Sequence, residues 1–282
     1  MNQSEVVNKR LKMGRLAPRQ LGFGANMKMH LLRGVLSDLG PAPADSPDYV
    51  AAVYAQSPAG WGMALNDTYG DCTIASEAHT EMLRTANAGT INIPSDAEIA
   101  AVYAAVQGYS GSLTDAAAVT AFLANNDGGA VEAAVIDYLV KTGVDARHLT
   151  AAANIDPANL DHIKWAVCLF GSCLLGINIY SQAQDLYEAD RPWDYIADAT
   201  CEGGHAVPVV KYDADGTFWV VTWGKLQAVT TAFMNGVYAD GSRYVEEAHA
   251  ELGFDFIEAT GYSPGGFSGT QLIADLQAVS QQ

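Results

Sequence analysis

Two residues far apart in the sequence have the types and local settings of a thiol nucleophile and its base. Cys72 follows Gly70-Asp71 and begins a helical pattern, and His205 follows two glycines and begins a strand-like run. A thiol at a helix N-terminus lies at the positive end of the helix dipole, which favours the nucleophilic thiolate. An imidazole beside it can accept the proton and later return it to a leaving amine. The pair therefore predicts acyl transfer to a cysteine.

The residues that follow Cys72 predict a helical first half of the chain. Apolar residues recur there at helix spacing, and further helices are expected over 95–106 and 130–140. Ser95, with Glu98 three residues later, forms a capping-box pattern at the start of one of them.

Strand patterns begin at about Cys173. Strands are expected over 174–179, 206–212 and 217–223, with a hairpin turn at 213–216 between the last two. A helical lobe followed by a sheet lobe predicts an α+β fold with a cleft between the lobes.

Composition divides the chain of 282 residues into three parts. Residues 1–48 form a basic arm that ends in a proline-rich linker, residues 49–260 form the main domain, and residues 261–282 form a loop-like tail. The first 40 residues carry seven basic and two acidic side chains, so 7 − 2 = +5, and the remainder carries −17 − 5 = −22.

This charge distribution limits the classes of partner. An acidic body repels phosphate backbones, so we expect no nucleic acid to bind it. The basic arm could bind a nucleic acid or a membrane surface, but we expect it to lie against the acidic body of its own chain or of a neighbouring subunit, which would support self-association.

The sequence also predicts no membrane anchor. No apolar run approaches the ~18 residues of a membrane span, and residues 1–19 lack the apolar core of a secretion signal. We therefore expect the protein to be cytoplasmic, or its location to be unknown from the sequence.

Four cysteines are too few for a disulfide scaffold. A disulfide between two of Cys168, Cys173 and Cys201 stays open at this point. Cys201-x-x-x-His205 has a metal-like spacing, but no second pair of ligands accompanies it, so we expect neither a metal nor a cofactor.

Several segments, in order, resemble the papain-like cysteine peptidase superfamily. The gap between Cys72 and His205, 205 − 72 = 133 residues, lies within the ~130–150 of papain-type enzymes. Asn-Asp-Gly-Gly at 126–129 is similar to the segment whose backbone pairs with substrate in that family. His-Ala-Val-x-x-Val-x-Tyr at 205–212 is similar to its histidine strand, and Trp223-Gly224 to its tryptophan-glycine pair. The resemblance covers roughly residues 60–225.

The resemblance implies a papain-like two-lobed fold, with the cysteine on the helical lobe and the histidine on an antiparallel sheet lobe. It implies Cys72 as nucleophile and His205 as base, with Asn66 and the Cys72 backbone N–H as donors to the oxyanion. The substrate-binding positions that it implies are Gly128, Gly129, Gly204 and Trp223.

The chain departs from the family at two positions beside the histidine. Val221 stands where the family has the asparagine that orients the imidazole, and Gly204 replaces an acidic or amide residue. A four-residue hairpin loop would pair 212 with 217 and 207 with 222, which places Thr222 on the His205 face. A register shifted by one residue would reverse this.

We therefore predict a thiol hydrolase that cleaves a peptide or another amide bond. Two alternatives stay open: a thiol acyltransferase, and a catalytically weak or inactive binding or structural protein on the same fold, which Val221 and Gly204 favour. We also hypothesise that the basic arm crosses the cleft and restrains access to Cys72, although it is short for the family's inhibitory pro-segment.

Other polar residues predict no chemistry. Glu247, His249 and Glu251 alternate with alanines, which indicates a solvated strand face. His79 lies seven residues after Cys72, or ~10.5 Å along a helix, too far to act as its base.

Overall fold

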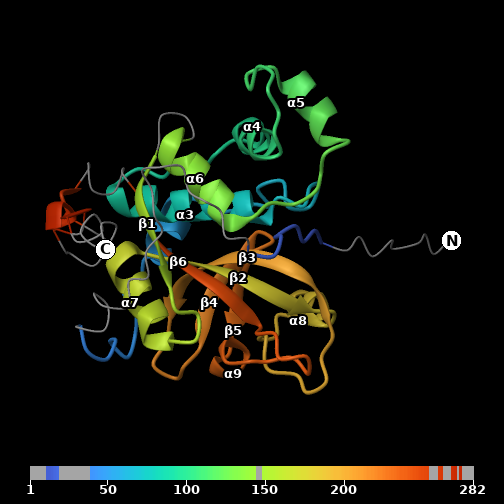
Figure 1. The fold of residues 1–282 in the computed structure, drawn as a ribbon. Helices are drawn as coiled ribbons and strands as arrows, with labels where there is room; N and C mark the ends of the chain where they lie inside the picture. The colour runs from blue at the N-terminus through green and yellow to red at the C-terminus, as the bar shows by residue number, and fades with distance from the viewer. Residues whose placement is uncertain are drawn as a thin grey trace, which may run out of the picture.

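The computed structural model describes residues 11–18, 39–143, 148–253, 260–262, 268–271 and 273–274, and these form a helical lobe packed on a sheet lobe (Figure 1). The α+β class predicted from the sequence is confirmed. The helices are α2 Val50–Gln56, α3 Cys72–Ala88, α4 Asp96–Val106, α5 Ala116–Leu123, α6 Glu132–Lys141, α7 Leu160–Phe170, α8 Ala183–Glu188 and α9 Thr231–Met234. The strands are β1 Leu149–Ile155, β2 Cys173–Tyr180, β3 Cys201–Tyr212, β4 Phe218–Thr222, β5 Lys225–Val229 and β6 Val245–Gly253.

Helix α3 joins the two lobes. It begins at Cys72, is buried along most of its length, and packs against α2, α4, α6, β3 and β4. The capping box predicted at the start of α4 is confirmed, because Ser95 accepts from the Glu98 N–H while the Glu98 side chain accepts from the Ser95 N–H. None of the described helices combines the length and apolar character needed to cross a membrane.

The described strands form one antiparallel sheet in the order β1-β6-β2-β3-β4-β5. Helix α7 packs on β6, β2 and β3 and shares the main hydrophobic core with them. Strand β3, which carries His205, lies near the centre of the sheet, so its backbone is held by partners on both sides.

The β3–β4 hairpin differs from the prediction by one residue at its turn. Tyr212 pairs with Phe218 rather than with residue 217. A bulge between Val209 and Lys211 adds a residue to β3 and restores the predicted pairing of Val209 with Val220. The slip is thereby cancelled before the strand reaches His205.

The prediction of a solvated face on β6 is wrong. Glu247 is half-buried, and His249 and Glu251 are buried, because β6 is an interior strand whose acidic face meets the helical lobe. Arg84 of α3 forms a 2.9 Å ion pair with Glu251 there. The alanines between them face α7 in the main core. Strand alternation alone could not reveal that both faces are covered.

Candidate active site

Cys72 lies where the helical lobe meets β3. Its side chain is buried, and Sγ takes backbone hydrogen bonds from Ala206 and Gly14. Burial outweighs these two contacts and raises the pKa of the thiol to about 12. The cysteine is therefore a neutral thiol in this structure at physiological pH.

His205 lies on β3, one residue before the Ala206 whose backbone contacts Sγ, and its side chain is buried. Its Nε2 lies 2.8 Å from the Thr222 hydroxyl, and its ring stacks on Trp223 at 4.8 Å between centroids. Its Nδ1 has no hydrogen-bond partner among the residues that the structure describes. Burial, together with the charge of Arg15, lowers the pKa of His205 to about 3. The imidazole is therefore neutral, with one nitrogen held and the other unpaired.

Thr222, and not Val221, contacts the imidazole. Val221 points to the opposite face of β4, where it packs in a cluster with Val53, Met82 and Leu83. A threonine hydroxyl can donate to or accept from a ring nitrogen, so it can hold either tautomer of the neutral ring.

Asn66 braces the loop before Cys72. Its side-chain Nδ2 donates to the Tyr69 carbonyl at 3.3 Å and to the Asp71 carboxylate at 3.2 Å. Both amide hydrogens are therefore engaged inside the loop, and donation to an oxyanion would require one of these bonds to break.

Asp127 ties the loop 127–130 to the loop before Cys72. Its Oδ1 accepts from the Gly70 N–H at 2.7 Å and from the Tyr103 hydroxyl at 2.8 Å. Tyr103 in turn accepts from the Gly129 N–H, and the Gly129 carbonyl accepts from Gln107. Both backbone groups of Gly129 are therefore hydrogen-bonded within the helical lobe. The backbone N–H and carbonyl of the next residue, Ala130, are the groups that pair with another segment.

Residues 11–18 of the basic arm occupy the place where a cleft is expected (Figure 1). The Arg15 N–H donates to the Gly204 carbonyl at 3.1 Å, and the arm pairs there antiparallel to β3. The Ala130 N–H donates to the Gly14 carbonyl and the Leu16 N–H to the Ala130 carbonyl, each at 2.8 Å, so the arm pairs parallel to that segment. The arm thus bridges the two lobes through isolated β-bridges at Arg15, and Gly14 contacts the Cys72 sulfur.

Glycines allow this close approach. A Cβ on Gly14 would lie 1.6 Å from the Gly70 carbonyl oxygen, one on Gly129 would lie 2.0 Å from the Gly14 oxygen, and one on Gly204 would lie 2.3 Å from the Arg15 oxygen. Of the predicted binding positions, Gly129 and Gly204 therefore touch the arm, and Trp223 donates to the Lys12 carbonyl at 3.2 Å. A Cβ on Gly128 would instead face Gln107, and the arm pairs at Ala130.

No family model and no curated protein matches this chain. Solved structures do. Xylellain, a cysteine protease from Xylella fastidiosa, is 15% identical with a TM-score of 0.56 over 87% of this chain and 98% of its own. ProCathepsin B S9 from Trypanosoma congolense is 13% identical with a TM-score of 0.57 over 86% of each chain. Digestive procathepsin L 3 of Tenebrio molitor is 11% identical with a TM-score of 0.55 over 81% and 74%.

This chain has the papain-like fold. At identities of 11–15%, the similarity shows the fold alone. Evidence for an activity has to come from the residues of the site. On this papain-like fold, Cys72 begins helix α3 and His205 lies on the neighbouring strand β3. The end of β4 places Thr222 and Trp223 against His205. Asn66 is turned into its own loop, and all four cysteines are free thiols.

One part of this junction was not predicted from the sequence. Arg15 of the arm is buried among Glu132, Glu246 and Glu247. A carboxylate at 132, within the apolar run 130–136, was the available signal, because an isolated charge on an apolar helix face needs a buried partner.

Proposed function

We propose that this chain is a thiol hydrolase of peptide or other amide bonds that its own N-terminal arm holds closed. The observation that carries the proposal is the arrangement of His205. Its Nε2 is held by Thr222 and its ring by Trp223. Its Nδ1 has no hydrogen-bond partner in the described part of the chain, and the next residue on the strand, Ala206, contacts Cys72.

The reaction follows from these groups. The Cys72 thiol gives its proton to His205, and the sulfur attacks the carbonyl carbon of the substrate. The C–N bond breaks, and the leaving amine takes the proton from His205. Water, deprotonated by His205, then attacks the thioester, releases the acid and restores the thiol. An amine in place of water would give acyl transfer by the same steps.

The N-terminus of α3 supports the oxyanion in this proposal. The first N–H groups of a helix have no carbonyl partners within it, so the Cys72 N–H is available to a developing negative charge. Asn66 would be the second donor once it releases Asp71.

The arm supports a closed resting state. It covers Cys72, and the thiol and the imidazole beneath it are both neutral. Two of the similar structures are named as pro-forms, proCathepsin B and procathepsin L. Residues 11–18 are short for such a role, but Gly14 contacts the Cys72 thiol directly and Arg15 anchors the arm through its ion pairs with Glu246 and Glu247.

Hydrolysis should depend on both members of the pair. In a chain whose arm is displaced by Gly14→Val, we expect Cys72→Ala and His205→Ala each to lower kcat/KM toward a mixture of fluorogenic peptide amides by at least about 10³-fold. Cys201→Ser, at an exposed thiol, should leave the rate unchanged. Equal rates in the Cys72→Ala and parent proteins would exclude a thiol mechanism.

Thr222 should act as a positioning residue. In the same background, Thr222→Val should lower kcat/KM about 10- to 100-fold, because a buried imidazole nitrogen loses the hydroxyl that holds it. Thr222→Ser keeps the hydroxyl and should retain most of the rate. The pH profile should also shift in Thr222→Val, whereas a purely structural defect would lower the melting temperature and leave the apparent pKa values unchanged.

A binding or structural role is the second candidate. It is favoured by Asn66, whose amide hydrogens are both engaged inside the loop. If the arm-displaced chain binds peptides but Cys72→Ala changes neither binding nor any turnover, this second function is the correct one.

A further inference from the structure

A buried acidic pocket holds the side chain of Arg15. The guanidinium is fully buried, with Nη1 2.8 Å from Glu247 Oε1 and Nη2 2.6 Å from Glu246 Oε2. Its Nε lies 3.9 Å from Glu132 Oε1, and Nη2 lies 3.4 Å from Asn178 Oδ1. The arm thus places one cation among three carboxylates drawn from α6 and β6.

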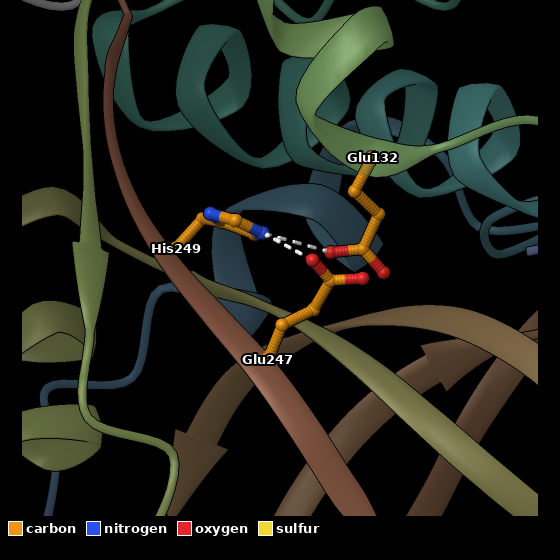
Figure 2. Close-up of side chains that lie close together, drawn as sticks. All are labelled: Glu132, Glu247 and His249. Carbon is orange, nitrogen blue, oxygen red and sulfur yellow. Dashed lines mark hydrogen bonds and ion pairs between the residues drawn. The ribbon is translucent and has the colours of Figure 1, made fainter. Parts of the chain in front are cut away.

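The carboxylates that line this pocket outnumber the cationic side chains of the lobes that form it. Figure 2 shows Glu132 of α6 and Glu247 and His249 of β6 pointing toward one another, and His249 Nε2 lies 3.3 Å from each carboxylate. Glu132 is buried, and its carboxylate contacts two cationic side chains, His249 at 3.3 Å and Arg15 at 3.9 Å. Glu246, which is partly exposed and contacts Arg15, adds a third carboxylate to the pocket, so the pocket is anionic when Arg15 is absent. Stranding buried charge in this way is strongly unfavourable.

The pocket lies beside the thiol along the arm. Gly14 contacts Cys72, and Arg15, the next residue, enters the pocket while its backbone pairs with Gly204. Gly14 and Leu16 pair with Ala130 on the other wall. An extended peptide that displaced the arm would meet the same two backbone edges. Its residue next to the one at the thiol would then face the acidic pocket.

We propose that Glu132, Asn178, Glu246 and Glu247 form a pocket that selects an arginine side chain of a peptide substrate, and that Arg15 fills it in the closed state. This proposal rests on the proposed function, because a substrate must take the place of the arm. The planar guanidinium offers several donors at fixed angles, which suits carboxylates approaching from different elements.

A metal ion fits the same residues less well. The candidate ligand atoms of Glu132, Glu247 and His249 lie within 4.8 Å of one another. However, the two carboxylates raise the pKa of His249 to about 9, against the effect of its burial. A protonated imidazole donates from both nitrogens and has no lone pair for a metal.

Binding by a catalytically dead chain tests the proposal apart from the chemistry. The protein is the full chain with Gly14→Val, to displace the arm, and Cys72→Ala, to prevent turnover. The probes are fluorescent blocked hexapeptides of alanine and glycine with one arginine at each position in turn. Matched peptides carry citrulline, which has the same shape without the charge, or lysine. We expect one position at which arginine binds about 30-fold more tightly than citrulline and more tightly than lysine.

Variants of the pocket should remove this preference. Glu247→Gln, and separately the partly exposed Glu246→Gln, should each reduce the arginine-to-citrulline ratio about 10-fold. Asp215→Asn, in the exposed turn between β3 and β4, removes a carboxylate elsewhere and should leave the ratio unchanged. Thermal melting checks that each variant is folded, and Glu246→Gln keeps the test valid if a more buried change fails to fold.

Three results would overturn the proposal. One is equal binding of arginine and citrulline at every position. Another is equal binding of arginine and lysine peptides with equal losses in Asp215→Asn and Glu247→Gln, which would indicate general attraction to an acidic surface. The third is a pocket that binds Zn²⁺ instead of arginine. In that case, Zn²⁺ bound by His249 would displace the peptides, and without Zn²⁺ arginine would show no preference over citrulline. If arginine is preferred but the chain with Cys72 intact hydrolyses nothing, the hydrolase function fails and the pocket stands as a peptide-binding site.

Discussion

Replacing Gly14 with valine should raise the rate at which iodoacetamide alkylates Cys72 by about three orders of magnitude at pH 8. A Cβ at this position would lie 1.6 Å from the backbone oxygen of Gly70, so the arm cannot remain over the thiol. Burial beneath the arm raises the pKa of Cys72 to about 12. At that pKa the thiolate fraction at pH 8 is about 10⁻⁴, whereas a solvated thiol near its ordinary pKa has about 0.1 to 0.3.

Mass spectrometry of the labelled peptides measures this effect within one molecule. Cys201 is exposed in the closed protein and serves as the internal reference, so the result is the ratio of Cys72 to Cys201 labelling. Leu16→Ala is the matched control, because it shortens a partly exposed arm side chain and keeps the backbone bonds to Ala130. An unchanged ratio in a folded Gly14→Val protein would show that the arm does not restrain the thiol.

Acid should open the arm. Between pH 6.5 and 4.5, the equilibrium constant for opening should rise by up to about 100-fold. The closed structure lowers the pKa of His205 to about 3 from its ordinary value of 6.5, so the open state binds the proton first. The stabilisation of the closed state is therefore complete above pH 6.5 and is lost as the pH falls toward 3, at no more than tenfold per pH unit. Cys72 has the opposite dependence, because the closed state raises its pKa from 9 to about 12. Its contribution to closure is complete below pH 9 and is lost as the pH rises toward 12.

The acidic pocket responds in a different pH range from His205. Burial raises the pKa of Glu132 to about 7 in the closed state, and Arg15 opposes that rise. A further rise when Arg15 leaves would weaken closure only as the pH falls toward 7, because below that value Glu132 is protonated in both states. The opening between pH 6.5 and 4.5 is therefore assigned to His205.

Hydrogen exchange of the arm measures this opening directly. The amides of Arg15 and Leu16 donate to Gly204 and Ala130, so their protection reports closure. After correction for intrinsic exchange, protection should fall with pH below 6.5, while the Trp193 amide, which bonds to Ala228 in the sheet, should hold its value. His205→Gln should remove most of the pH dependence. If the arm amides were equally protected at pH 4.5 and 7, the neutral histidine would not be linked to closure.

Local patterns predicted the parts of the site that belong to single elements. A helix starting at Cys72, a strand carrying His205 and the capping box before α4 follow from periodicity and capping within a few residues. The choice of Thr222 over Val221 also followed from alternation along one strand. It depended on the bulge at 209–211, which the sequence did not reveal and which cancelled an error at the turn.

The sequence by itself determined the two lobes and the pair of reactive residues, because these depend on spacing within helices and strands. Only the tertiary structure decided what covers that pair. Arg15 and Glu247 are 232 residues apart, and nothing in either neighbourhood encodes their contact. Strand β6 has an alternation typical of a strand with one solvated face, and its acidic face is buried because α3 and α6 pack over it. Burial on both faces is a property of the assembled lobes, so the acidic pocket and the closed arm could not be predicted from any single segment.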